Sequence, residues 1–172
     1  GLNVAAASLD PSFFGALPTT FVSCGFFTHE TQATPLRQGL APEWKFVAQY
    51  VLGVDDLFLH YLATSRLRLE LYQSWGVEAQ LVAACEVPLR ERLHGGGKKP
   101  RLTQRAPLLS VPLVGRPGEP ASTARTVGHI VFEAKMRRRI DHAAAAFLQQ
   151  FPDLAALALL PVQGGGRTRE LV

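Results

Sequence analysis

Two short stretches of this 172-residue chain contain residue types that act in catalysis, but neither has the spacing that the chemistry needs. The glycine-rich run at 95–100, GGGKKP, lacks the GxxxxGK(S/T) pattern that cradles phosphate, and Lys99 precedes a proline without a backbone N–H. His29 and Glu30 begin like the zinc-protease motif HExxH, but Ala33 occupies the position of the second histidine. We therefore predict a linker at 95–100 and no catalytic zinc site.

The other histidines show no ligand spacing with the cysteines, and no serine lies in a nucleophile-elbow sequence. We therefore predict that the chain is not an enzyme and has no cofactor, no metal and no small-molecule substrate. Its two cysteines, Cys24 and Cys85, are too few for a disulfide framework and lie in strand-like apolar runs. They are predicted to be reduced core thiols of a cytosolic compartment.

Positive charge is concentrated in one half of the chain. Residues 86–139 contain twelve Lys and Arg against four acidic residues, a net of +8, so the remainder carries −4 of the total of +4. This basic half of the chain suggests an anionic partner, which could be a lipid headgroup, an acidic protein surface or a tubulin-like polymer. The alternative is a solvated set of loops without a partner. Nucleic acid is not expected, because no basic recognition helix or aromatic stacking platform accompanies these charges. The candidate contacts are Arg90, Arg92, Lys98, Lys99, Arg101, Arg105, Arg137, Arg138 and Arg139.

Short apolar runs separated by Gly and Pro predict an antiparallel β-sandwich of about eight strands. The clearest alternation is RLRLELY at 66–72, where Leu67, Leu69 and Leu71 should face the core. The run at 107–114 contains Pro112, which should confine it to an edge or a bulge. Further runs are predicted around Leu2, Val4 and Ala6 and at 21–27, 44–52, 81–87 and 127–136.

A helix is predicted to close the domain. Apolar residues recur at helical spacing from Ile140 to Phe151, and Pro152 should stop the pattern. We expect the stripe to pack on the sandwich, or alternatively to begin an interface with a partner. The predicted organisation is a sandwich at 1–137, an amphipathic helix at 138–152, and an apolar then flexible tail at 153–172. No apolar run approaches a membrane span, and the missing initial Met suggests a fragment of a longer protein.

The stretch 32–62 combines ordered turn residues with apolar alternation. Pro35, Gly39 and Pro42 predict a structured turn, which a period-two strand follows from Trp44. Asp55 and Asp56 are placed to cap the short apolar helix of LFLHYL.

The motifs of this stretch are Ala33-Thr34-Pro35, Gly39-Leu40, Pro42-Glu43-Trp44, Phe46, Gln49-Tyr50, Val54-Asp55-Asp56-Leu57-Phe58-Leu59 and Tyr61, followed further on by Ala83-Ala84-Cys85 and Pro88-Leu89. In these motifs the chain resembles the C2 domains of the retinitis pigmentosa GTPase regulator-interacting protein and fantom family, over roughly 2–151 and most closely over 21–93. The resemblance implies an all-β, antiparallel, eight-stranded C2-type β-sandwich with a C-terminal helix. It also implies a coiled-coil-containing scaffold of the ciliary transition zone, basal body or axoneme, whose C2 domains bind other ciliary proteins.

The resemblance implies that calcium is not bound. Calcium-binding C2 domains gather about five carboxylates on loops at one end, because this hard cation needs many oxygen ligands. The first such loop here retains Asp10 but has Thr19 where an aspartate is expected, and the third has Gln73 and Ser74 with Glu78 nearby. These acids are too few for a dication.

Two functions follow as expectations. The first is a non-catalytic, calcium-independent protein-interaction domain of a cytoplasmic, ciliary scaffold. The alternative is a calcium-independent peripheral membrane module, in which the basic half contacts anionic lipid and the loop aromatics Phe13, Phe14 and Trp75 insert into the bilayer interface.

Overall fold

The computed structural model describes residues 1–90, 101–111, 124–137 and 139–159. Arg92, Lys98, Lys99, Arg138, Pro112 and the predicted linker and flexible end therefore lie outside the described residues, and Arg101 is described for its backbone only. The strands are β1 (Leu2–Leu9), β2 (Thr19–Cys24), β3 (Gln32–Ala33), β4 (Arg37–Gln38), β5 (Glu43–Ala48), β6 (Arg66–Trp75), β7 (Glu78–Pro88), β8 (Arg101–Ser110) and β9 (Thr126–Lys135). The helices are α1 (Pro11–Phe14), α2 (Asp56–Thr64), α3 (Asp141–Gln150) and α4 (Pro152–Leu159).

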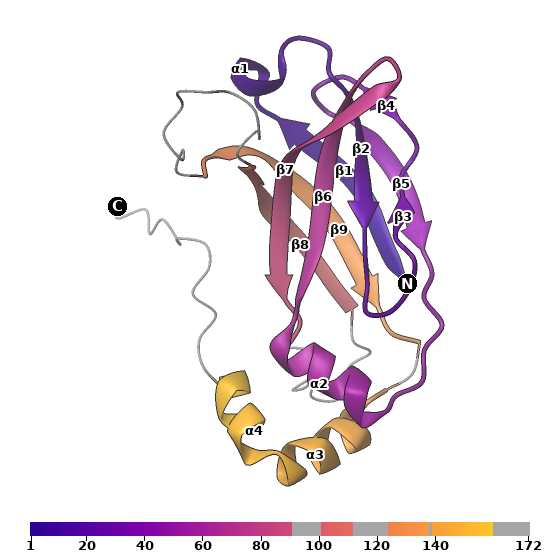
Figure 1. Ribbon diagram of the computed structural model, residues 1–172, viewed down its shortest axis with the longest axis vertical. Helices are drawn as coiled ribbons and strands as arrows, with labels where there is room; N and C mark the ends of the chain where they lie inside the picture. The colour runs from indigo at the N-terminus through magenta and orange to yellow at the C-terminus, as the bar shows by residue number, and fades with distance from the viewer. Residues whose placement is uncertain (91–100, 112–123, 138, 160–172) are drawn as a thin grey trace.

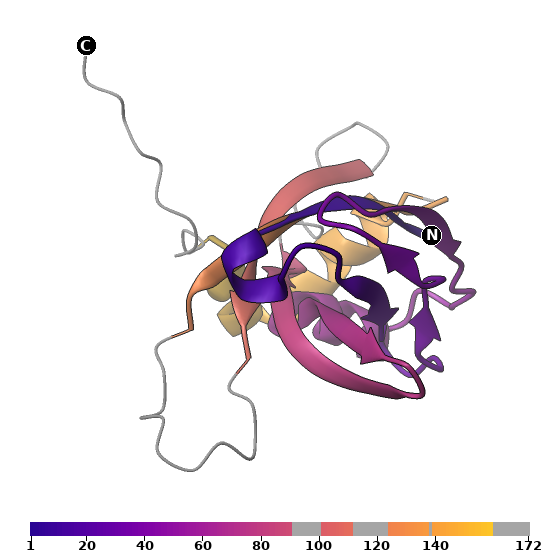
Figure 2. The same cartoon turned by 90° about the horizontal axis from the view of Figure 1, so that it is seen from above.

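The strands pair antiparallel in the order β3-β2-β6-β7-β8-β9-β1-β5, with β4 also on β2. The β7–β8 ladder comprises only Ala83 with Ser110 and Ala84 with Leu109, so the strands form two layers that join at that point. Figure 1 shows an upper end with α1 and the β6–β7 hairpin, and a lower end with α2, α3 and α4. Figure 2, a view from above, shows α1 in front, and α2, α3 and α4 behind at the far end of the strands. This arrangement confirms the antiparallel sandwich, and the two two-residue strands β3 and β4 are additions to the expected set.

Strand β6 has the predicted alternation. Leu67, Leu69 and Leu71 are at most 2% exposed, whereas Arg66 and Arg68 face solvent. These leucines join a core that includes Phe58, Phe132 and Ile130, from α2 and β9. Because apolar burial is the main favourable term in folding, β6 is central to the stability of the domain.

Strand β1 departs from simple alternation. Its register shifts between Val4 and Ala6 against both β5 and β9. The resulting bulge moves the buried set from the even to the odd positions, so that Ala7 and Leu9 are buried and Ala6 is only partly so. The alternation of Leu2, Val4 and Ala6 therefore continues only as far as Val4.

Two strands begin or end at residues other than those predicted. The run at 44–52 forms a strand only to Ala48, although Tyr50 and Leu52 still pack against the core. The run at 107–114 belongs to β8, which begins at Arg101 and carries Pro107 opposite His129. Proline within a strand lacks the N–H for one ladder bond, and a register shift follows directly between Leu108 and Leu109.

The helices follow from capping and apolar spacing. Asp55 caps α2 by accepting a 2.8 Å hydrogen bond from the backbone N–H of Phe58, as predicted. In α3, Ala144 and Phe147 are buried together with the preceding Ile140. Pro152 does end α3, but it also begins α4, because the first position of a helix needs no N–H donor. No helix in the described ranges is long and apolar enough to span a membrane.

Candidate interaction surfaces

Helix α1 turns one of the candidate aromatic residues inward. Asp10 caps this helix by accepting a 2.9 Å hydrogen bond from the N–H of Ser12, and hydrogen bonding from the Ser12 side chain, followed by that from its backbone, lowers the pKa of the Asp10 carboxyl. Phe14 is 5% exposed and belongs to the core, which corrects the expectation that it is a loop-tip contact. Phe13 is partly buried against Phe14, with ring centroids 4.9 Å apart, and the Arg125 guanidinium lies 5.2 Å from its ring centre.

The β6–β7 hairpin presents the third candidate aromatic to solvent. Trp75 is 55% exposed, and Val77, beyond Gly76 with φ +68°, is fully exposed. The pairing of Thr19 with Ser74 brings the start of β2 beside this hairpin, so the exposed Leu17 lies at the same end. We call Leu17, Trp75 and Val77 the apolar tip.

The acidic residues described near the apolar tip lie on separate elements. Asp10 serves as a helix cap, and Glu78 lies opposite Trp75 in the β6–β7 ladder. The Gln73 side chain donates to the carbonyl of Phe14 at 3.5 Å. Within the described part of the chain, no three His, Cys, Asp or Glu side chains gather as a metal site would require.

The described basic candidates lie away from the apolar tip. Arg90 follows β7 and Arg137 and Arg139 follow β9, and both strands run from the upper to the lower end (Figure 1). Arg105 is exposed along β8. Since a ten-residue strand is about 33 Å long, the arginines after β7 and β9 are separated from the tip by nearly the length of the sandwich.

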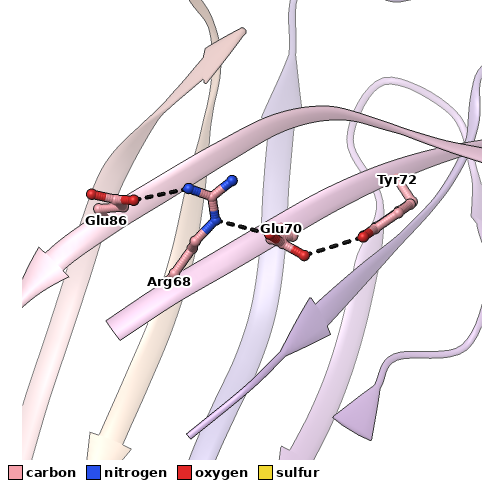
Figure 3. A network of polar contacts seen from close by, with 4 residues as sticks. All are labelled: Arg68, Glu70, Tyr72 and Glu86. Carbon is pink, nitrogen blue, oxygen red and sulfur yellow. Dashed lines mark hydrogen bonds and ion pairs between the residues drawn. The ribbon is translucent and has the colours of Figure 1, made fainter. Parts of the chain in front are cut away.

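Sequence reasoning missed an ordered polar network on the outer face of β6 and β7 (Figure 3). The Arg68 Nε donates to Glu70 at 2.8 Å, and its Nη1 donates to Glu86, directly opposite on β7, at 3.0 Å. The Tyr72 hydroxyl donates to the other Glu70 oxygen at 3.1 Å, and its ring stacks on Phe21 at 5.1 Å. Alternation placed Arg68 and Glu70 on one face, but the partnership with Glu86 depends on the register of β6 against β7.

The two carboxylates of this network are balanced by Arg68 together with Arg66, whose guanidinium lies 3.9 Å from Glu86. The hydrogen bond to Glu70, followed by that to Glu86, raises the pKa of Arg68, and burial together with Glu70 raises the pKa of Tyr72. A small pocket beside the network is lined by Ser23, Gly25, Thr31, Arg68 and Glu70. Fixed arginine and aromatic side chains of this kind are typical of protein-binding surfaces.

The two cysteines lie inside the sandwich as free thiols, as predicted. Burial raises the pKa of Cys24 and of Cys85 to about 12 in each case. Thiols of this kind are poor nucleophiles, because the reactive form is the thiolate.

Two antiparallel layers joined through one short ladder, with loops at both ends, define a C2 domain. The family model described as the first C2 domain of RPGR-interacting protein 1 matches residues 2–139, and the chain belongs to this family. The resemblance expected from residues 32–62 is thereby confirmed.

Relatives match over part of the chain only. X-linked retinitis pigmentosa GTPase regulator-interacting protein 1 from Homo sapiens is 43% identical over 67 residues, which is 39% of this chain and 5% of that protein. The Bos taurus protein of the same name is 43% identical over 84 residues, 45% of this chain and 7% of that protein. The chain therefore corresponds to a small part of the relatives it matches.

A solved structure supports the fold at low sequence identity. It is described as "CC2D1B coordinates ESRCT-III activity during the mitotic reformation of the nuclear envelope". The TM-score is 0.61 at 13% identity, over 91% of this chain and 58% of that chain. At this identity the likeness concerns the fold alone.

Proposed function

We propose that this chain is a non-catalytic, calcium-independent protein-interaction module of a ciliary scaffold protein. Family membership supports the proposal, because the relatives are named for an interaction with another protein. Localisation to the ciliary transition zone, basal body or axoneme, and binding to other ciliary proteins, belong to the same proposal.

One observation favours a protein partner over a bilayer. The apolar tip and Arg90, Arg137 and Arg139 lie at opposite ends of the sandwich, so one flat membrane does not contact both together. Peripheral membrane binding gains its strength from apolar insertion and electrostatic attraction acting at the same surface. Protein partners can instead use one end or one face at a time.

The membrane alternative rests on Trp75 and Val77, which are exposed at the tip of a hairpin. Co-sedimentation with phosphatidylcholine vesicles, with and without phosphatidylserine, separates the two functions. We expect the chain to remain in the supernatant with both vesicle types. Sedimentation that is lost in Trp75→Ala, but kept in a variant altered on the β6 face such as Arg68→Ala, would instead establish the membrane function.

The ciliary assignment is tested on the full-length protein. Endogenously tagged protein should colocalise with markers of the transition zone, basal body or axoneme in ciliated cells. Exclusive localisation elsewhere in the cell would contradict the proposal.

A further inference from the structure

The family motif that begins α2 exposes aliphatic side chains that the fold leaves unused. Val51 is 90% exposed, Val54 42% and Leu57 65%, all within seven residues of the connection from β5 to α2. Single exposed aliphatic residues are ordinary, but a group of three in so short a segment resembles a contact surface. We call Val51, Val54 and Leu57 the α2 patch.

The residues on either side of Val51 are anchored to the rest of the domain. The Tyr50 hydroxyl donates to the carbonyl of Cys24 at 3.1 Å, and Leu52 packs against the core. Val51 lies between these two anchors and is left in solvent. The segment is therefore fixed on both sides of Val51, which reduces the entropy lost when a partner binds.

The helix start fixes the other two side chains. Asp55 bonds the N–H of Phe58, while Phe58 and Leu59 are each 2% exposed in the core. With these two positions turned inward, Leu57 faces solvent on the first turn of α2, and Val54, just before the Asp55 cap, is also exposed. The motif thus has a buried half that the fold requires and an exposed half for which the fold shows no use.

Acidic side chains lie next to the α2 patch in the sequence and favour a basic partner, while Arg90, Arg137 and Arg139 follow strands that end at the same lower end. Asp55 and Asp56 are exposed between Val54 and Leu57. Glu30 is also exposed, in the loop whose His29 ring lies 5.5 Å from that of Tyr50, and His60 is exposed one turn beyond Asp56. Carboxylates at this position repel an anionic bilayer and attract Lys or Arg.

We propose that the α2 patch docks a protein segment that presents apolar side chains flanked by Lys or Arg, such as one face of a basic amphipathic helix. This inference rests on the proposed interaction function and assigns it a surface and a class of partner. Val51, Val54 and Leu57 supply the apolar contact, while Asp55 and Asp56 select the charge of the partner. The polar network around Arg68 and the apolar tip are separate surfaces.

The test is a titration of the isotope-labelled chain, followed by NMR, with a Leu/Lys amphipathic helical peptide. Its twin carries Glu in place of every Lys. We expect saturable shifts confined to residues 51–60 with the Lys peptide, and binding at least about ten-fold weaker with the Glu twin. No saturable binding of the Lys peptide, or equal binding of both, overturns the proposal.

Matched variants locate the contact. Leu57 and Leu17 are 65% and 64% exposed, respectively, on opposite ends of the domain. Leu57→Ser should weaken binding by about ten-fold and Leu17→Ser by less than about two-fold, since only the first removes a contact. Asp56→Asn should lower the salt dependence of binding, whereas Glu78→Gln at the hairpin should not. Equal losses in the two leucine variants contradict the assignment.

Three further outcomes separate this inference from the function on which it rests. A dimer in light scattering that dissociates in Leu57→Ser would identify a second copy as the occupant and overturn the proposed partner class. If the chain binds neither the vesicles nor the peptides, the docking function of the α2 patch is contradicted, but the proposed protein-interaction function is not. Vesicle binding lost in Trp75→Ala would remove the interaction function itself.

Discussion

Thr34 and Val22 form a two-way connection at the edge of the first layer. The Thr34 hydroxyl accepts a 2.9 Å hydrogen bond from the N–H of Val22, and the Thr34 N–H donates to the Val22 carbonyl at 2.9 Å. One residue thus satisfies both backbone groups of Val22 in the gap between β3 and β4. The Ala-Thr-Pro motif therefore has a structural role in completing the edge of β2.

Thr34→Val should destabilise the domain by about 1–3 kcal/mol, because it leaves the Val22 N–H buried without a partner. The change preserves the shape of a side chain that is only 6% exposed. Urea denaturation measures the loss, with Thr28→Val at an exposed position as the control. Equal midpoints for Thr34→Val and the wild type would contradict this role.

Leu69→Ala should cost on the order of 2 to 5 kcal/mol, because it opens a cavity where the side chain is wholly buried. Arg68→Ala, one residue away, should cost within about 0.5 kcal/mol, because its ion pairs are half-exposed and screened. Denaturant midpoints of the two variants test the contrast. Similar losses would mean that β6 is not divided into a core face and a solvent face.

The melting temperature should be the same in millimolar calcium as in the presence of a chelator. A ligand at one hundred times its dissociation constant would stabilise the native state by about 2.7 kcal/mol, or roughly 5 to 10 °C in a domain of this size. Differential scanning fluorimetry with calcium, magnesium and EDTA makes the comparison. A calcium-specific rise of several degrees would contradict calcium independence.

The thiols should be unreactive in the folded chain and react fully in urea. Burial raises the pKa of Cys24 and Cys85 from 9.0 to about 12, so at pH 8 the thiolate is scarce in the native state. Titration with a disulfide reagent at pH 8 measures this difference. Rapid native-state reaction of both thiols would contradict their burial.

The same pKa shifts predict a loss of stability at alkaline pH. Because the folded thiols titrate above the unfolded value of 9.0, their contribution is complete below pH 9 and is lost as pH rises towards 12. Unfolding free energies at pH 8 and pH 10 should differ less in a Cys24→Ala, Cys85→Ala double variant than in the wild type. An unchanged difference would assign the alkaline loss to other groups.

The three candidate loop aromatics show where the local sequence pattern stopped being informative. Phe13, Phe14 and Trp75 are alike from sequence, since aromatic residues occur in cores and at contact surfaces. The one-turn helix after Asp10 buries Phe14 and leaves Phe13 half-covered, while the tight turn at Gly76 projects Trp75 into solvent. The buried and exposed positions of these three side chains became clear only from the packing of α1 against the sandwich and from the turn at Gly76.

The sequence by itself determined the sandwich, the buried face of β6, the Asp55 cap and the family, because alternation and capping are short-range and need no knowledge of distant partners. Tertiary structure decided the bulge in β1, the pairing of Arg68 with Glu86 and the separation of the apolar tip from the arginines of the lower end. These features depend on strand register and on the direction in which each strand crosses the sandwich. Register is set by the sum of many long-range contacts, and no stretch of neighbouring residues specifies it alone.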